Sequence, residues 1–215
     1  MYKAVIFDMD GVIVDNHHYH VAAFSEFCKL KGIPFSEGEF RVKYFGKSNH
    51  EIFSGLLHRE ISKEESALLG DEKEAIYRQI YKEHITPVSG LIDFLRLLKG
   101  NSINIAVGTS AGSQNLDFVL SNLNIRHFFD AQVDSSYVER GKPNPDIFLK
   151  AAERLGVKPS ECLVFEDSVS GIQAAHAAGM DVVALLTTHK RDELPLVSLY
   201  VEDFTDPGIR ELMNI

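Results

Sequence analysis

The stretch KAVIFDMDGV, residues 3–12, decides the fold. Its first half, residues 3–7, is a short apolar run rich in β-branched residues, which predicts a buried β-strand. The run gives way directly to Asp8 and Asp10, and Gly11 permits a bend there, so both carboxylates can face one cavity. Like charges held this close are costly without a cation. A surface turn that happens to be acidic would explain one aspartate at the end of this strand. It explains poorly why polar and acidic residues also follow the other predicted strands.

Three more apolar runs follow, and each gives way to small and polar residues at its carboxyl end. They are residues 103–107 before GTSAGS, 162–165 before EDSVSG, and 182–186 before TTHKR. Helical periodicity lies between the runs, over residues 90–99, 113–122, 145–155 and 170–178. Strands that alternate with helices predict an α/β fold with a doubly wound parallel sheet. Within the last helix, we expect His176 to pack rather than to catalyse.

The segment after the first strand has a different pattern. Strand-like runs disappear, and helical periodicity dominates until Thr86-Pro87, where proline discourages further helix. We therefore predict two domains. A core domain comprises residues 1–15 and 86–215, and an inserted helical domain comprises residues 16–85.

Chemically active side chains gather where the predicted strands end. Thr109 follows the second run, Lys142 lies in GKPNPD, and Glu166 with Asp167 follows the third run. In parallel α/β sheets, ligands bind beyond the carboxyl ends of the strands. Four separate segments are thus expected to converge on one active site.

The motifs at these strand ends resemble those of the haloacid dehalogenase superfamily, in particular its β-phosphoglucomutase-like phosphatases. DMDGVIVD is similar to the first superfamily motif, VGTSAG to the second, GKPNPDIF to the third and FEDSVSGIQAA to the fourth. The four occur in the expected order and at fitting separations, and the resemblance spans nearly the whole chain. Four motifs in register are far more specific than any one of them.

The resemblance implies roles for the catalytic residues. Asp8 is expected to attack phosphorus and form an aspartyl-phosphate, and Asp10 to act as general acid and base. Lys142 is expected to neutralise charge on the transferring group. Thr109 and neighbouring backbone amides, with Ser110 beside them, are expected to hold the phosphoryl oxygens.

The resemblance also implies a Mg²⁺ cofactor. Its expected ligands are the Asp8 carboxylate, the backbone carbonyl of Asp10 and Asp167, with Glu166 close by. Hard oxygen ligands of this kind suit Mg²⁺.

The helical domain resembles a cap that closes over the active site and contacts substrate. Its candidate substrate residues are His20, near the expected hinge at Asn16, and the loop Gly46, Lys47, Ser48 and Asn49. Mutases of this subgroup present an arginine near the position of Asn49 and a lysine near Phe45, so the chain departs from the mutase pattern here. A bisphosphate intermediate would then be held less firmly, unless Lys47, Arg41 or Lys43 compensates.

These observations favour a Mg²⁺-dependent phosphatase that hydrolyses small phosphate monoesters, with sugar phosphates as the best substrate class. A β-phosphoglucomutase-type phosphomutase is the main alternative. Asp10 and the Glu166-Asp167 pair argue against a dehalogenase. A phosphonatase would need a lysine that forms a Schiff base, for which Lys47 is only a formal candidate. A non-catalytic binding protein ranks last because all core positions are present.

Composition limits the partners. The chain has 215 residues and a net charge of -9 with scattered lysines and arginines, so we expect small phosphorylated metabolites and no nucleic acid. No stretch predicts a signal peptide or a membrane span, which favours the cytoplasm and no membrane partner. We expect a monomer. Cys28 and Cys162 are expected to pack, and the histidines at 17, 18 and 20 lack the cysteines or second shell that would support a transition-metal site.

Overall fold

The computed structural model describes residues 1–44 and 49–215, with only the backbone described at positions 41 and 42. The chain divides into two compact units. One unit comprises Met1–Asp15 and Ile85–Ile215, and the other comprises Asn16–His84.

A six-stranded parallel sheet forms the centre of the first unit, in the order β3-β2-β1-β4-β5-β6. Its strands are β1 (Ala4–Phe7), β2 (Asn104–Gly108), β3 (Ala131–Val133), β4 (Cys162–Glu166), β5 (Asp181–Leu185) and β6 (Leu199–Val201). The predicted doubly wound parallel sheet is confirmed. The sequence did not predict β3 and β6, because three residues are too few to show a strand pattern.

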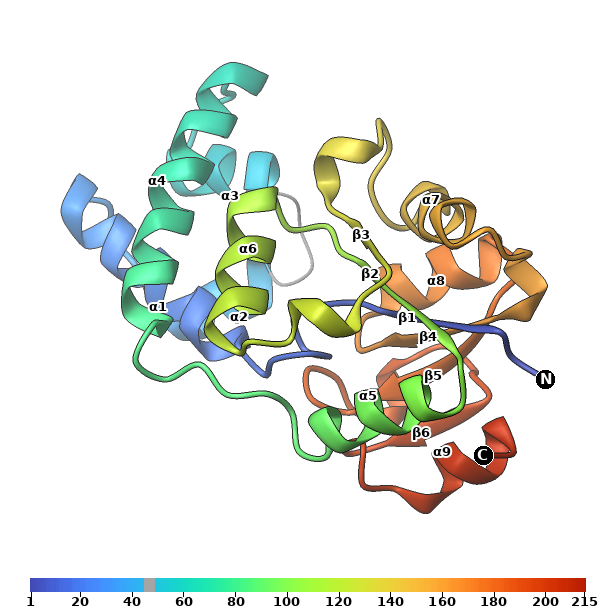
Figure 1. The fold of residues 1–215 in the computed structure, drawn as a ribbon. Helices are drawn as coiled ribbons and strands as arrows, with labels where there is room; N and C mark the ends of the chain where they lie inside the picture. Colours follow the sequence, from blue (N-terminus) through green and yellow to red (C-terminus); the bar gives the residue numbers. More distant parts are fainter. Residues whose placement is uncertain (45–48) are drawn as a thin grey trace. The chain divides into compact units, whose positions relative to one another are not determined.

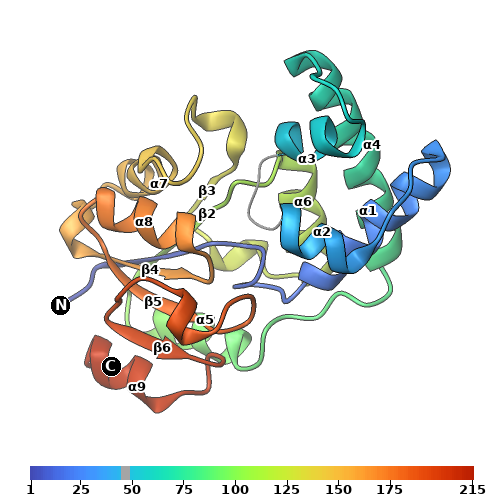
Figure 2. The ribbon, with the colours of Figure 1, turned by 180° about the vertical axis from the view of Figure 1, so that it is seen from behind.

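Helices cover both faces of this sheet, as Figures 1 and 2 show. Helices α7 and α8 lie on one face, and α5 lies on the other. Alternation along β1 sends Ile6 into a core with Phe148 of α7, while Phe7 packs against Phe94 of α5 at 6.1 Å between ring centroids. The helices of the unit are α5 (Leu91–Gly100), α6 (Ser113–Asn122), α7 (Asp146–Leu155), α8 (Val169–Ala177) and α9 (Pro207–Met213).

The second unit is helical in its described residues. It contains α1 (His17–Lys31), α2 (Glu37–Tyr44), α3 (Asn49–Leu56) and α4 (Lys63–Tyr81). Aromatic side chains dominate its core, including Phe24, Phe27 and Phe53. Ser62 caps α4 by accepting a hydrogen bond from the backbone N–H of Glu65, which explains why the helix begins at residue 63.

Three smaller expectations can be compared with the structure. Cys28 and Cys162 are buried free thiols, as expected of packing residues. His176 is exposed on the solvent side of α8, so the expectation that it packs is wrong. Among the described residues, we find no helix with the length and apolar character that a membrane span requires.

Candidate active site

Strand pairing places Asp8 beside the acidic pair that follows β4. Strands β1 and β4 are parallel neighbours with Phe7 opposite Phe165, and the backbone N–H of Asp8 donates to the carbonyl of Phe165 at 2.9 Å. The residues that follow this pair in the two strands, Asp8 and Glu166, therefore lie at the same edge of the sheet. This register brings together acids that lie far apart in the sequence.

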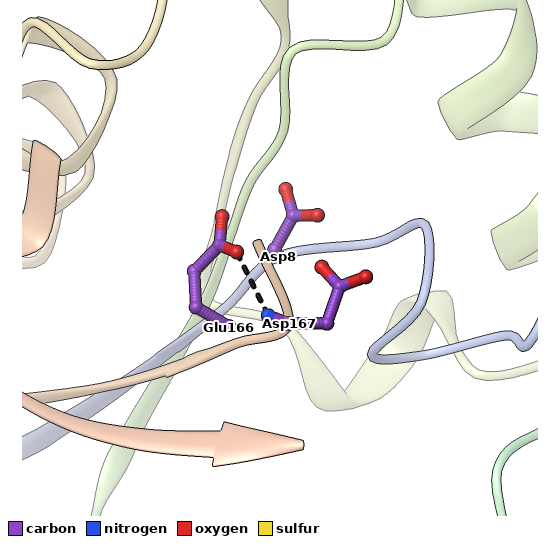
Figure 3. A group of neighbouring side chains, drawn as sticks. All are labelled: Asp8, Glu166 and Asp167. Atoms are coloured by element: carbon purple, nitrogen blue, oxygen red, sulfur yellow. Dashed lines mark hydrogen bonds between the residues drawn. The ribbon is translucent and has the colours of Figure 1, made fainter. Parts of the chain in front are cut away.

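Asp8, Glu166 and Asp167 form a buried acidic cluster (Figure 3). Each side chain offers one carboxylate oxygen, and these oxygens lie within 4.8 Å of one another. In Figure 3, the Asp167 carboxylate points away from that of Glu166 and toward the segment that follows Asp8. Hard oxygen donors in this arrangement suit Mg²⁺.

The electrostatics of the cluster also fit a cation. The pKa of Asp8 is raised to about 7, because burial and the charges of Glu166 and Asp10 together outweigh the opposing effect of Lys142. Burial and the charges of Glu166 and Asp8 likewise raise the pKa of Asp167 well above its ordinary value. A divalent cation among these oxygens would offset both effects, so the residues present fit a Mg²⁺ ion.

Lys142 supplies the positive charge that the protein itself brings to the cluster. Its Nζ atom lies 2.7 Å from Oδ1 of Asp8 and 2.6 Å from Oε1 of Glu166. Although burial lowers the pKa of Lys142, the two carboxylates outweigh it and raise the pKa above its ordinary value. The ammonium also lies over the ring of Phe148 at 4.8 Å from its centroid, so Lys142 is held on several sides.

The loop that carries Lys142 is braced on both sides of it. Arg140 donates two hydrogen bonds to the carboxylate of Asp146, at 3.0 and 2.9 Å. Asn144 donates to the backbone carbonyl of Gly141 from both its backbone and its side chain, at 3.0 Å each. These contacts hold the start of α7 close to the loop, which fixes the direction of the lysine.

Glu166 is fully buried and is engaged by several donors. Oε2 accepts hydrogen bonds from the backbone N–H groups of Asp167 and Ser168, both at 2.8 Å, and from the Ser168 hydroxyl at 3.0 Å. Burial alone would raise the pKa of Glu166, but Lys142 and these N–H groups hold it below its ordinary value. A Cβ on Gly171 would lie 1.7 Å from Oε1, so only glycine fits beside this carboxylate.

The turn after Asp8 is tight and depends on Gly11. Gly11 has φ +78°, and its backbone N–H donates to the carbonyl of Val14 at 2.7 Å. A Cβ at this position would lie 2.0 Å from Oδ2 of Asp167. The turn therefore lies directly against the acidic cluster, and the partly buried Asp10 sits within it.

Thr109 lies at the end of β2 and is buried, whereas its neighbour Ser110 is exposed. The backbone N–H of Thr109 donates to the carbonyl of Val133 at 3.0 Å, which extends the pairing with β3. The Thr109 Oγ1 accepts a hydrogen bond from the N–H of Ala111 at 3.1 Å. The hydroxyl is therefore fixed in place and can still donate its own hydrogen.

A family model described as haloacid dehalogenase-like hydrolase matches residues 2–179. The chain belongs to the haloacid dehalogenase (HAD)-like hydrolases. Fructose-1-phosphate phosphatase YqaB of Escherichia coli (strain K12) is 35% identical over 182 residues, covering 85% of this chain and 95% of that protein. β-Phosphoglucomutase of Bacillus subtilis (strain 168) is 36% identical over 190 residues, covering 85% and 83%. The crystal structure of a family IA, variant 3 HAD hydrolase from Entamoeba histolytica matches with a TM-score of 0.92 at 30% identity, covering 100% of this chain and 98% of that one.

These comparisons bear on several predictions. The predicted superfamily, the likeness to β-phosphoglucomutase and the enzyme class of phosphoric monoester hydrolase are confirmed. The individual residue roles in this HAD hydrolase stay predictions. The expected cytoplasmic location and monomeric state also stay predictions.

The predicted substrate residues of the helical unit belong to a different part of the structure. His20 lies in α1, where its Nδ1 is 2.8 Å from Nζ of the buried Lys73 and its ring stacks on Tyr77 at 3.9 Å. Asn49 begins α3 and is exposed. Gly46, Lys47 and Ser48 lie outside the described residues. A role for any of these residues at the active site of the HAD core stays a prediction.

Two residues at the edge of this HAD site were not predicted. Thr187 and Thr188 follow β5, and Thr187 Oγ1 donates to the backbone carbonyl of Gly11 at 2.6 Å. The Thr188 hydroxyl lies close to the carboxylate of Asp167. The sequence held a signal for them, because polar residues follow the apolar run at 182–186 as they follow the other strands.

Proposed function

We propose that this HAD hydrolase is a Mg²⁺-dependent phosphatase that releases phosphate from small phosphate monoesters, with sugar phosphates as its substrate class. The observation that carries the proposal is the buried contact of 2.7 Å between Asp8 and Lys142, within the acidic cluster. A buried carboxylate beside a fixed positive charge supports the proposed role of Asp8 as the nucleophile. The named activity of the Escherichia coli relative supports the substrate class.

Asp8, Asp167 and the backbone carbonyl of Asp10 are the proposed ligands of Mg²⁺. Glu166, predicted from the sequence to lie close to the metal, accepts hydrogen bonds from Lys142, Ser168 and the N–H of Asp167, which favours a role in holding Lys142 over direct ligation. Bound Mg²⁺ supplies positive charge that offsets the repulsion between the phosphate and the acids and polarises the phosphoryl group.

The first half-reaction forms a bond between a carboxylate oxygen of Asp8 and phosphorus, while the bond from phosphorus to the ester oxygen breaks. Asp10 donates its proton to the departing alkoxide, which leaves as an alcohol. Lys142 stays beside Asp8 and stabilises the negative charge that spreads over the transferring group. The Thr109 hydroxyl, which accepts a hydrogen bond from the N–H of Ala111, donates its own hydrogen to a phosphoryl oxygen, because that oxygen can only accept.

In the second half-reaction, water attacks the phosphorus of the aspartyl-phosphate. Asp10, now ionised, takes the proton from this water, and the bond between phosphorus and Asp8 breaks. Inorganic phosphate leaves, and both aspartates return to their initial states. A phosphomutase would instead return the phosphoryl group to another hydroxyl of the sugar.

The cap sequence favours hydrolysis over phosphomutase activity. Mutases of the subgroup present an arginine near the position of Asn49, and the amide of Asn49 cannot form the charged bidentate contact that an arginine offers to a second phosphate. Sequence identity does not separate the two activities, because the phosphatase and mutase relatives are equally similar. We therefore rank hydrolysis above phosphomutase activity because of Asn49.

Two assays test this proposal. Phosphate release from fructose 1-phosphate and from an aryl phosphate is expected to require Mg²⁺ and to fall by at least about a thousandfold in Asp8→Asn. Asp15→Asn is the matched control, because Asp15 is exposed beyond the turn. Isomerisation of β-glucose 1-phosphate without phosphate release would overturn the proposal in favour of a mutase. Hydrolysis that is unaffected by Asp8→Asn would exclude the covalent mechanism.

A further inference from the structure

The segment after β5 reaches the active site from a strand outside the four recognised motifs. Strands β4 and β5 are parallel neighbours with Glu166 opposite Ala184, so their carboxyl ends lie at the same edge of the sheet. On the other side of β5, the backbone N–H of Leu186 extends the pairing with β6 by donating to the carbonyl of Val201 at 2.9 Å. Thr187 and Thr188 come next and leave the sheet beside the acidic cluster.

Thr187 holds the turn that carries the two catalytic aspartates. Its Oγ1 lies 2.6 Å from the carbonyl oxygen of Gly11, a residue 176 positions away in the sequence. The carbonyl of Gly11 directly follows Asp10 in the chain. The N–H of Gly11 donates to the carbonyl of Val14. The turn is therefore held both by its own backbone and by Thr187, which follows β5.

Thr188 lies beside the acidic cluster. Its hydroxyl lies close to the Asp167 carboxylate and acts to lower the pKa of that acid. The point that a Cβ on Gly11 would occupy lies 3.0 Å from Thr188 Oγ1 and 2.0 Å from Asp167 Oδ2. Gly11, Thr188 and Asp167 therefore lie against one another. Because Gly11 has no Cβ, the Thr188 hydroxyl and the Asp167 carboxylate can occupy the space beside it.

We propose that Thr187 and Thr188 are positioning residues for the metal site, with Thr188 orienting Asp167 and Thr187 fixing the turn of Asp8 and Asp10. This inference rests on the proposed function, because it takes these acids to be metal ligands. Outer hydrogen bonds of this kind restrict the orientations of a ligand, and their loss weakens metal binding even when the ligand remains. A purely structural role as strand-end contacts would instead change folding stability without changing metal affinity.

Metal binding without substrate tests the inference. The dissociation constant for Mn²⁺ is measured in the full chain from the electron paramagnetic resonance signal of free Mn²⁺. Thr188→Val keeps the shape of the side chain and removes the hydroxyl, and it is expected to weaken Mn²⁺ binding by about tenfold. Thr188→Ser restores the hydroxyl and is expected to restore the affinity. Thr187→Val is expected to weaken binding in the same direction, with rescue by Thr187→Ser.

Thr205→Val is the matched control, because the Thr205 hydroxyl donates to an aspartate, Asp203 at 2.6 Å, in the exposed loop after β6. It is expected to bind Mn²⁺ as the wild type does. Folding of each variant is checked by urea unfolding in EDTA. If Thr188→Val is folded and binds Mn²⁺ with wild-type affinity, the inference is wrong.

The same measurements separate the inference from the proposed function. Weaker Mn²⁺ binding in Thr188→Val supports the positioning role even if the wild type hydrolyses none of the phosphate esters tested. Conversely, Mg²⁺-dependent hydrolysis by the wild type, together with unchanged Mn²⁺ binding in folded Thr188→Val, supports the function and refutes the inference.

Discussion

The Nζ atom of Lys142 lies 2.7 Å from Oδ1 of Asp8, although 134 residues separate the two in the chain. Only 6% of the Lys142 side chain and 10% of the Asp8 side chain are exposed. Removing one partner of a buried ion pair leaves an uncompensated charge, which destabilises the fold more than the intact pair stabilises it. We therefore expect the pair to serve both stability and the proposed chemistry, and a change in one partner to affect both.

Lys142→Met tests this double role. The variant is expected to lower kcat by at least about a hundredfold, because it removes the ammonium that we propose stabilises the transferring group. In EDTA, its free energy of unfolding is expected to fall by about 3 kcal/mol, since Asp8 and Glu166 lose their partner. The kcat is measured by steady-state hydrolysis of an aryl phosphate, and the free energy of unfolding is measured by urea unfolding.

Lys150→Met is the matched control for this experiment. Lys150 lies on α7, where 36% of its side chain is exposed and it pairs only with Glu153 among the contacts described. It is expected to retain kcat and to change stability by less than about 0.5 kcal/mol. Wild-type kcat in Lys142→Met would contradict the role assigned to the lysine.

Gly171→Ala tests how closely the fourth motif packs on Glu166. The added Cβ would lie 1.7 Å from Oε1 of Glu166, so the carboxylate must shift away from Lys142. We expect the free energy of unfolding to fall by about 1–3 kcal/mol and activity to fall with it. Gly100→Ala, at the open end of α5 with no atom within 4 Å, is expected to be neutral or slightly stabilising. Equal effects of the two substitutions in urea unfolding would refute the argument.

The sequence predicted the core site because parallel strands carry their carboxyl ends to one edge of a sheet. That rule alone predicts that Asp8, Glu166 and Asp167 lie close together. In the structure, one carboxylate oxygen from each lies within 4.8 Å of the others. The contact of Thr187 with Gly11 could not be predicted, because it depends on the register of β5 and on a turn with positive φ. The edge strands β3 and β6 escaped prediction because three residues carry no recognisable period.

Asp130 provides a pH-dependent contribution to stability away from the active site. Burial acts to raise its pKa, but hydrogen bonds from Lys99 and from the backbone N–H of Ile105 lower it below its ordinary value. An acid whose folded pKa is lowered stabilises the fold above its unfolded pKa, about 3.9, and loses that contribution as the pH falls. Asp130→Asn is therefore expected to be less stable than the wild type at pH 7, by about 0.5–1 kcal/mol since the side chain is 40% exposed.

The difference between Asp130→Asn and the wild type is expected to shrink as the pH falls from 5 to 3, in urea unfolding with EDTA present. Asp71→Asn, an exposed position on α4, serves as the control and is expected to show no such trend. A difference that stays constant or grows toward pH 3 would show that the charge of Asp130 does not contribute.

Asp167→Asn separates the demands of metal binding from those of folding. Burial and the charges of Glu166 and Asp8 raise the pKa of Asp167 well above its ordinary value. An acid with a raised folded pKa destabilises the fold at neutral pH, because the unfolded chain accommodates its charge better. In EDTA at pH 7.5, the neutral asparagine is therefore expected to raise the free energy of unfolding by about 1–2 kcal/mol.

Mg²⁺ is expected to reverse this order. At a concentration one hundred times its dissociation constant, a ligand that binds only the folded state adds about 2.7 kcal/mol to the free energy of unfolding. The wild type gains this amount, whereas Asp167→Asn gains little because it lacks a proposed ligand, so the wild type becomes the more stable protein. Asp15→Asn, changed at an exposed position, is expected to follow the wild type in both conditions. If Asp167→Asn is less stable than the wild type in EDTA, the acidic cluster is not under the repulsion that a cation relieves, and the magnesium site loses its main physical argument.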